Sequence, residues 1–524
     1  MPIGFRFIPA LCAGWLAVAA LPSAAHAQLP PLTVPKGHLR MDLGGSFNTW
    51  DRRFRLGQSE DAAQDFIRDA VGSDFWPGLR PGDSLITRIT GLSNALNLGS
   101  TAASQHVFVG SMSLGMAYGL TSRLTVFGVL PFRRVQVRST LGQDSATANS
   151  GLNPADPTFG DGFGAAQDAT FFAQFDAALT ALQGKLGSGF YDDDPAAKQL
   201  AEQTLVAGAS LRTDLFALLL DPATASPFLP TVSSAAGTAI LQKVGTLQAA
   251  LAGLTVTGFT LAPALPARRV GASEFENFIT NGSGPVAGSL DSPVLTSLGD
   301  VELGAAYLIV DRRRDDGMSS LRVAGQALIR LRTAMLDNPN RFFDVGTGDR
   351  QPDVELGLAA DLRQGRFGAR FSGSYNLQLA GNAQKRIAPP SVPIPWASTL
   401  AAVTRTPGNE LRLGVQPFFA LTRTFAFTIS GQYVNHATDS YGLLEGQPEI
   451  PGYPVEQLAE ESQASWIEAS AGLTFAAPFE IKGDQPHRPL DAGIAYHTVV
   501  SASGGRVPRT ADFRFFLRYY AKFP

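Results

Sequence analysis

The chain has 524 residues, of which 44% are apolar and only 17% are charged, and its formal net charge is −3. A disordered chain would carry fewer apolar residues and a larger net charge. The nearly equal numbers of positive and negative side chains argue against a nucleic-acid partner, because binding to phosphates relies on excess positive charge. This length holds either two or three soluble domains or one large barrel.

Residues 1–27 have the pattern of a secretory signal peptide. Their only charge is Arg6, residues 7–21 form an apolar core, and Ala25-His26-Ala27 is a small-x-small cleavage site. Cleavage after Ala27 also removes Cys12, the one cysteine of the chain. The mature protein would then have no thiol for a disulfide, a thiolate metal site or a nucleophile. The sequence therefore predicts an exported protein.

Long segments of alternating apolar and polar residues follow. In 424–435, for example, Phe425, Phe427 and Ile429 share one face of a strand, because side chains alternate with a period of two. Strands of soluble sandwiches usually have ~5–6 residues, whereas these segments approach or exceed the ~9–11 that cross a bilayer obliquely. Twelve strands are predicted, at 39–50, 105–118, 122–137, 299–311, 319–332, 353–363, 366–379, 409–421, 424–437, 464–476, 488–499 and 511–523.

The connections alternate between tight turns and long loops, which is typical of outer-membrane barrels, as is an even number of strands. The predicted fold class is all-β, a transmembrane antiparallel β-barrel of about 12 strands with an inserted α-helical subdomain. The predicted division is a signal peptide at 1–27, barrel strands 1–3 in 28–137, the insert at 138–298 and barrel strands 4–12 in 299–524.

The segment 138–298 has helical rather than strand periodicity. One apolar stripe contains Phe171, Phe175 and Leu182, with Asp168 as a possible N-cap, and a second helix is predicted from Asp194-Pro195. A third stripe runs from 240 to 254. The segment is too long for a simple loop. We expect a helical subdomain at the outer mouth or partly in the lumen, and the sequence leaves open whether it plugs the pore or only decorates the surface.

The polar faces of the strands supply the candidate lumen-lining residues. Their charges have both signs, which favours pairing across neighbouring strands in a narrow barrel; the alternative is an arginine ladder that selects anions. The candidates are Arg322, Gln326, Arg330, Arg332, Glu355, Asp361, Arg366, Arg370, Glu410, Arg412, Arg514 and Arg518.

No motif predicts a catalytic site, a metal site or a cofactor, so we expect a protein that is not an enzyme. His436 with Ser440 is the one arrangement that resembles a base and a nucleophile, but residues four apart on a strand lie ~13 Å apart. The stretch 344–348 (DVGTG) and the acidic segment 191–194 (YDDD) have the oxygen ligands that Ca²⁺ prefers, without EF-hand spacing. Solvated loops are the simpler interpretation of both.

Four segments read YGLTSRLTVFGVLPF (118–132), LGDVELGAAY (298–307), DVGTGDRQPDVELGLAADL (344–362) and PGNELRLGVQPFFAL (407–421). They resemble strand and turn signatures of the outer-membrane proteins grouped as the MetA-pathway of phenol degradation family. The resemblance implies an outer-membrane barrel and uptake of small hydrophobic or aromatic compounds. The insert at 138–298 departs from the family.

The predicted function is therefore a passive outer-membrane channel, with outer-membrane lipid and a small-molecule solute as partners. A further partner is the barrel-assembly machinery, because the last strand ends in Phe523 and looks like its C-terminal signal, although Pro524 follows. Two alternatives remain: a non-conducting structural or adhesive barrel that displays the insert, and a barrel lipid hydrolase.

Overall fold

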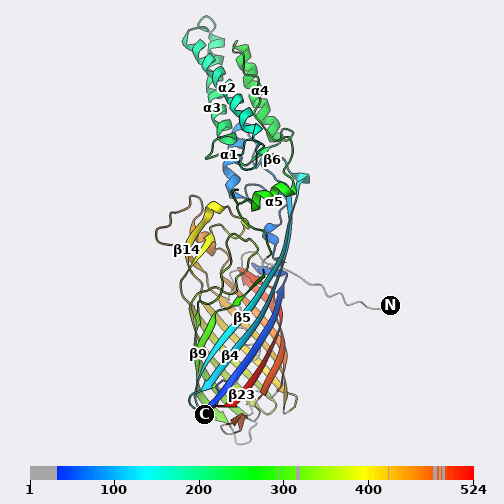
Figure 1. Cartoon of the computed structure of the whole chain (residues 1–524), viewed down its shortest axis with the longest axis vertical. Coiled ribbons are helices and arrows are strands. Elements are labelled where there is room, and N and C mark those ends of the chain that lie inside the picture. The colour runs from blue at the N-terminus through cyan, green and yellow to red at the C-terminus, as the bar shows by residue number, and fades with distance from the viewer. Residues whose placement is uncertain are drawn as a thin grey trace, which may run out of the picture.

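The computed structural model describes residues 32–292, 294–313, 319–422, 424–475, 481–482, 485–486 and 490–523. The predicted signal peptide and Pro524 lie outside these residues. Twelve strands form one antiparallel sheet in sequence order, and pairing of β1 with β23 closes it into a barrel (Figure 1). The predicted fold class and strand number are confirmed.

The barrel strands match the predicted set one for one. They are β1 (His38–Trp50), β4 (Ser100–Gly119), β5 (Leu124–Asp144), β9 (Val301–Arg313), β10 (Ser319–Leu331), β11 (Asp353–Gln364), β12 (Phe367–Gln378), β15 (Glu410–Ala420), β16 (Phe425–His436), β18 (Ala464–Phe475), β21 (Leu490–Gly504) and β23 (Ala511–Lys522). Two of them are much longer than expected, because β4 begins at Ser100 and β5 continues to Asp144. The predicted insert therefore begins with strand.

Apolar side chains point outward from the barrel and polar ones point inward. On β16, Phe425, Phe427 and Ile429 are exposed while Thr428 is buried in the interior. On β23, Phe513 and Leu517 are exposed and Arg518 is buried. An outward apolar surface on a closed sheet is suited to lipid, since no backbone edge is left unpaired. Among the described residues, no helix is long and apolar enough to cross a membrane.

Small sheets lie at the end of the barrel opposite the C-terminus, which we call the outer end because the long loops extend from it (Figure 1). β2 (Arg52–Arg55) pairs with β3 (Gln58–Asp61) and β22 (Arg506–Pro508), and β14 (Leu400–Thr406) pairs with β13 (Gly381–Arg386) and β17 (Ser440–Leu443). β8 (Val294–Leu298) pairs with the outer part of β5. The remaining short strands are β6 (Ser150–Leu152), β7 (Phe228–Pro230), β19 (Ile481–Lys482) and β20 (Gln485–Pro486). These strands are too short to show a period in the sequence.

The helices lie beyond the barrel, at the end opposite the C-terminus (Figure 1). They are α1 (Arg80–Thr90), α2 (Phe163–Gly187), α3 (Pro195–Leu219), α4 (Ala235–Gly253) and α5 (Ala272–Thr280). The long hairpin of β4 and β5 reaches up to them, and α2, α3 and α4 project farthest from the barrel. The sequence did not predict α1, which lies in the loop between β3 and β4.

The predicted apolar stripes form the core of this helical bundle. Phe171, Phe175 and Leu182 are fully buried, and the Asp194 side chain accepts a hydrogen bond from the Ala197 amide at 3.0 Å, as a helix N-cap. The predicted cap at Asp168 is wrong, because α2 begins at Phe163. Asp161 accepts hydrogen bonds from the amides of 163 and 164 and so begins the helix earlier.

Candidate transport pathway

The outer half of the lumen contains a large cavity. It has a volume of about 180 Å³ and is open on one side. Barrel residues such as Trp466 and His497 form one part of its wall, and loop residues such as Phe342, Pro390 and Val392 form another. The cavity therefore has apolar surfaces close to ionic ones.

Most charges around this cavity are already paired. Asp337 bonds Lys385 at 2.7 Å, and Arg405 bonds Asp439 at 2.7 Å. Arg386, which is buried, donates instead to three backbone carbonyls and to Asn340. Burial lowers the pKa of Arg386 to about 10. Because these charges bind one another or the backbone, they hold the loops in place.

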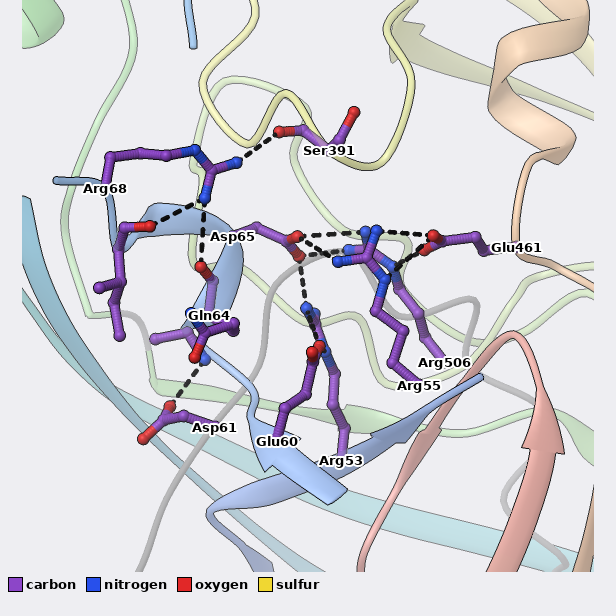
Figure 2. Close-up of polar contacts among 12 residues, drawn as sticks. Arg53, Arg55, Glu60, Asp61, Gln64, Asp65, Arg68, Ser391, Glu461 and Arg506 are labelled. Carbon is purple, nitrogen blue, oxygen red and sulfur yellow. Dashed lines mark hydrogen bonds and ion pairs between the residues drawn. The ribbon is translucent and has the colours of Figure 1, made fainter. Parts of the chain in front are cut away.

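A cluster of ion pairs, called here the mouth cluster, lies beside the outer cavity, which its members Glu461 and Arg506 line (Figure 2). Asp65 accepts hydrogen bonds from Arg53 at 2.6 Å and from Arg506 at 2.5 Å, and it also contacts Arg55. Glu461 bonds Arg55 at 2.6 Å and Arg506 at 2.5 Å. The cluster joins the first outer loop to two loops near the C-terminus and so fixes the shape of the mouth.

Glu461 in this cluster is held in its charged form. Burial alone would raise its pKa, but hydrogen bonds from Arg55 and Arg506 outweigh burial and lower the pKa below its usual value. The pKa of Asp439 is lowered against burial in the same way, by the hydrogen bond with His436 and by Arg405. A lowered pKa means that these carboxylates stabilise the folded loops at neutral pH, and that this stabilisation is lost as the pH falls through the folded-state pKa.

The hydrogen bonding of Asp439 also depends on Gly408. Its Oδ1 accepts the Gly408 amide at 2.9 Å. A Cβ at 408 would lie 1.9 Å from the carbonyl oxygen of Ala437, so no other residue fits there without a backbone shift.

Ion pairs between neighbouring strands also lie in the lumen, where the Arg330 group is at the strand ends that carry the outer loops. Arg330 on β10 bonds Glu302 on β9 at 3.0 Å, and Asp353 and Glu355 on β11 at 3.1 and 2.7 Å. His497 lies between Glu468 and Asp512, at 3.0 and 3.2 Å. We call these ion pairs the belt; Arg330 and Asp353 lie at the base of the loop 332–352, and His497 and Glu468 line the outer cavity.

A second, smaller cavity of about 90 Å³ lies near the inner end. Arg40, Phe516 and Arg518 line it, together with Leu32 and Thr33 from the segment that precedes β1. That segment lies inside the barrel: the Val34 amide donates to Thr125 Oγ1 at 2.8 Å, and Arg322 donates to Thr33 Oγ1 at 3.3 Å. It narrows the lumen at this end.

The structure places most of the predicted lumen residues on inward faces of the strands. These are Arg322, Gln326, Arg330, Glu355, Asp361, Arg370, Glu410, Arg412, Arg514 and Arg518. Arg370 bonds Asp361 on the adjacent strand, and Arg412 bonds Glu410 on its own strand. Arg332 follows the end of β10, is exposed and donates to the Ala380 carbonyl at 3.2 Å; Arg366 is exposed in the turn before β12.

Neither the mouth cluster nor the position of the segment at 32–35 inside the barrel was predicted from the sequence. Asp65 and Arg506 are 441 positions apart in the sequence, and a periodic pattern cannot predict a contact between such distant residues. The run Arg52-Arg53-Phe54-Arg55 directly after β1 was the one available signal, since arginines at a loop base need partners.

His436 does not form the base–nucleophile pair that was considered. Its Nε2 bonds Asp439 at 3.0 Å, its Nδ1 has no hydrogen-bond partner, and Ser440 is exposed. Asp344 accepts the Asn338 amide at 2.8 Å and so shapes its own loop. Within the described residues, no three or more His, Cys, Asp or Glu side chains are grouped to hold a metal ion.

No protein-family model matches the chain, and no curated protein matches it by sequence. Among solved structures it is similar to an outer membrane channel from Pseudomonas putida F1, with 8% identity over 93% of this chain and 97% of that one, and a TM-score of 0.41. The translocator domain of the autotransporter NalP from Neisseria meningitidis has 6% identity over 93% and 90%, with a TM-score of 0.31. The P. putida toluene transporter TodX has 10% identity over 94% and 92%, with a TM-score of 0.26. These proteins have different tasks, and the fold of this chain rests on its own strand pairing.

Proposed function

We propose that this chain is a passive outer-membrane channel for small, largely apolar solutes, including the aromatic class that the sequence resemblance implies. The observation that carries the proposal is the outer cavity, whose volume of about 180 Å³ is large enough for a small aromatic molecule, since an apolar cavity of about 150 Å³ is known to bind benzene. Ligand sites of this kind are mostly apolar, with a few polar groups that orient the ligand.

The pairing of charges favours a neutral solute over an ion. An anion that entered the cavity would compete with Asp337 for Lys385 and with Asp439 for Arg405, and both pairs are already made at 2.7 Å. The apolar surface of Phe342, Pro390 and Val392 is open to the cavity. A solute with an apolar body gains free energy there by leaving water.

The belt at Arg330 lies at the base of the outer loops, and the segment at 32–35 lies near the inner end of the barrel. Both narrow the lumen, so we expect a small ionic conductance and a strong dependence on solute size. We expect the protein in the outer membrane, assembled through its last strand.

A second candidate is a barrel that displays the helical bundle and conducts nothing. One observation favours it: no residue of α2, α3 or α4 lines either cavity described above, and these helices project away from the mouth (Figure 1). The lipid hydrolase has no comparable support, since neither hydrogen-bonding atom of His436 meets a serine hydroxyl in the described structure.

Swelling of proteoliposomes separates these candidates. We expect faster swelling with small neutral aromatic alcohols than with benzoate or with sugars of similar mass. Pro390→Trp, which fills the outer cavity, should slow it, whereas Ala181→Trp on the exposed side of α2 should not. Heat-modifiable mobility on gels confirms that each variant is folded. Swelling no faster than in empty liposomes would favour the display barrel.

A further inference from the structure

Three side chains form a row across adjacent strands of the lumen wall. Asn376 on β12 lies opposite Glu410 on β15, and Glu410 lies opposite His436 on β16. All three point inward and are buried, with 2%, 2% and 3% of their surface exposed. Opposite residues of an antiparallel pair have Cα atoms only about 4.5–5.5 Å apart. Glu410 therefore lies between Asn376 and His436 and is an immediate neighbour of each.

Each of these side chains has one polar atom without a hydrogen-bond partner. The atoms are Asn376 Oδ1, Glu410 Oε2 and His436 Nδ1. A buried polar atom without a partner costs about 1–3 kcal/mol, so three on consecutive neighbours need a common explanation. An amide oxygen, a carboxylate oxygen and an imidazole nitrogen can all donate a lone pair, which is the property that a metal cation requires.

The other polar atom of each side chain is fixed. Asn376 Nδ2 donates to Asp353 at 2.8 Å, Arg412 Nε donates to Glu410 Oε1 at 2.5 Å, and His436 Nε2 bonds Asp439 at 3.0 Å. A histidine that binds a metal ion almost always has its second nitrogen on a carboxylate or carbonyl. Here Asp439 supplies that carboxylate, and it leaves Nδ1 free.

The charges around the row favour a cation. Arg330 on one side faces three carboxylates, those of Glu302, Asp353 and Glu355. Arg412 lies closest and opposes a cation, but it is bonded to Glu410 and is also near the carboxylates of 355 and 468. Negative side chains thus outnumber positive ones along this part of the wall.

From these observations we propose that Glu410, His436 and Asn376 bind one divalent transition-metal cation of the Zn²⁺ class in the lumen. The imidazole selects this class over Mg²⁺ and Ca²⁺, which prefer oxygen ligands alone. Three protein ligands leave a position for water, as in open zinc sites. Asp439 is a positioning residue for His436. The proposal does not depend on the channel function, because binding is measured without transport.

Calorimetric titration of the full-length, tag-free protein in detergent tests it, with Zn²⁺ as the probe and Mg²⁺ as the comparison. We expect one saturable Zn²⁺ per chain and no saturation by Mg²⁺. His436→Gln should weaken Zn²⁺ binding at least 100-fold, and Asp439→Asn about 10–100-fold. His106→Gln, at a half-buried histidine on β4 outside both cavities described above, should leave binding unchanged.

Zinc K-edge absorption on the wild-type protein adds a measurement that needs no variant. One imidazole nitrogen in the first coordination shell is expected. Absence of that nitrogen would overturn the proposal. Absence of saturable Zn²⁺ binding would also overturn it, and ordered water would then be the partner of the three free atoms. Equal affinity in a folded His436→Gln protein would also overturn it. If Zn²⁺ binds but solutes do not cause swelling, the channel function is rejected and the metal site stands.

Discussion

The barrel lumen and the helical bundle are stabilised by opposite means. The lumen buries charged side chains such as Arg370 and Asp361, whereas the bundle buries Phe171, Phe175 and other apolar groups. The difference follows from the surroundings. The outer face of the barrel is apolar and suited to lipid, so the polar residues of each strand must lie inside and pair there; the bundle has no such outer face and follows the rule of soluble proteins.

The largest expected effect comes from breaking the lumen belt. Arg330→Met leaves the carboxylates of Glu302, Asp353 and Glu355 without their shared partner. Removing one member of a buried ion pair costs about 3–5 kcal/mol. Urea unfolding in detergent, followed by heat-modifiable mobility, measures the loss. Arg332→Met, two residues away and exposed, is the matched control. Equal stability of the two variants would contradict the assignment of the belt.

The corresponding change in the bundle is Phe175→Ala. Phe175 is fully buried and stacks on Phe259, with ring centroids 4.6 Å apart. Loss of a buried Phe side chain costs about 3–5 kcal/mol. We expect protease cleavage within 163–253 while the barrel keeps its heat-modifiable mobility. Phe163→Ala on the same helix, where the ring is 81% exposed, should change nothing. Simultaneous loss of the barrel would show that the two regions unfold as one unit.

A smaller effect concerns one charge inside the bundle. Asp168 is buried and accepts the Ala264 amide at 2.7 Å, and burial raises its pKa to about 6. A raised acid pKa stabilises the fold below the unfolded value near 3.8, and this contribution is lost as the pH rises through about 6. Asp168→Asn should therefore stabilise the bundle at pH 7.5, by about 1–3 kcal/mol at ~1.4 kcal/mol per pKa unit.

The gain from Asp168→Asn should vanish at pH 4, where the carboxyl group is protonated in the wild type. Thermal melting followed by proteolysis of the bundle at both pH values measures it. Asp193→Asn, at an exposed position, is the control. A gain of equal size at both pH values would show that the charge of Asp168 is not the cause.

The smallest expected effect is on transport when the bundle is removed. Gly151 lies against Pro266 and Arg268, so a short glycine linker can replace 152–265. Because α2, α3 and α4 line neither cavity, solute swelling should stay within about a factor of two of wild type. A large rise in conductance would instead make the bundle a cover of the mouth.

Much of the fold could be predicted from the sequence, because the bilayer imposes a simple rule. Each strand must be long and must alternate, so Phe425, Phe427 and Ile429 on one side of Thr428 are enough to indicate a membrane strand. The apolar stripe of α2 is equally local. The start of α2 was misplaced because Asp168 is a suitable cap by residue type, whereas the helix already begins at Phe163, where Asp161 accepts the amides of 163 and 164.

The candidate sites were decided by tertiary structure. Alternation assigns Glu410 and His436 to inward faces, but only the strand register places Glu410 directly between His436 and Asn376. The mouth cluster depends on the contact between Asp65 and Arg506. The segment that narrows the inner end is held by the contact between Thr33 and Arg322. Periodicity predicts which face of a strand is apolar and which is polar. It carries no information about which distant residue a buried charge will meet, because that choice is made when the barrel closes and the loops fold over it.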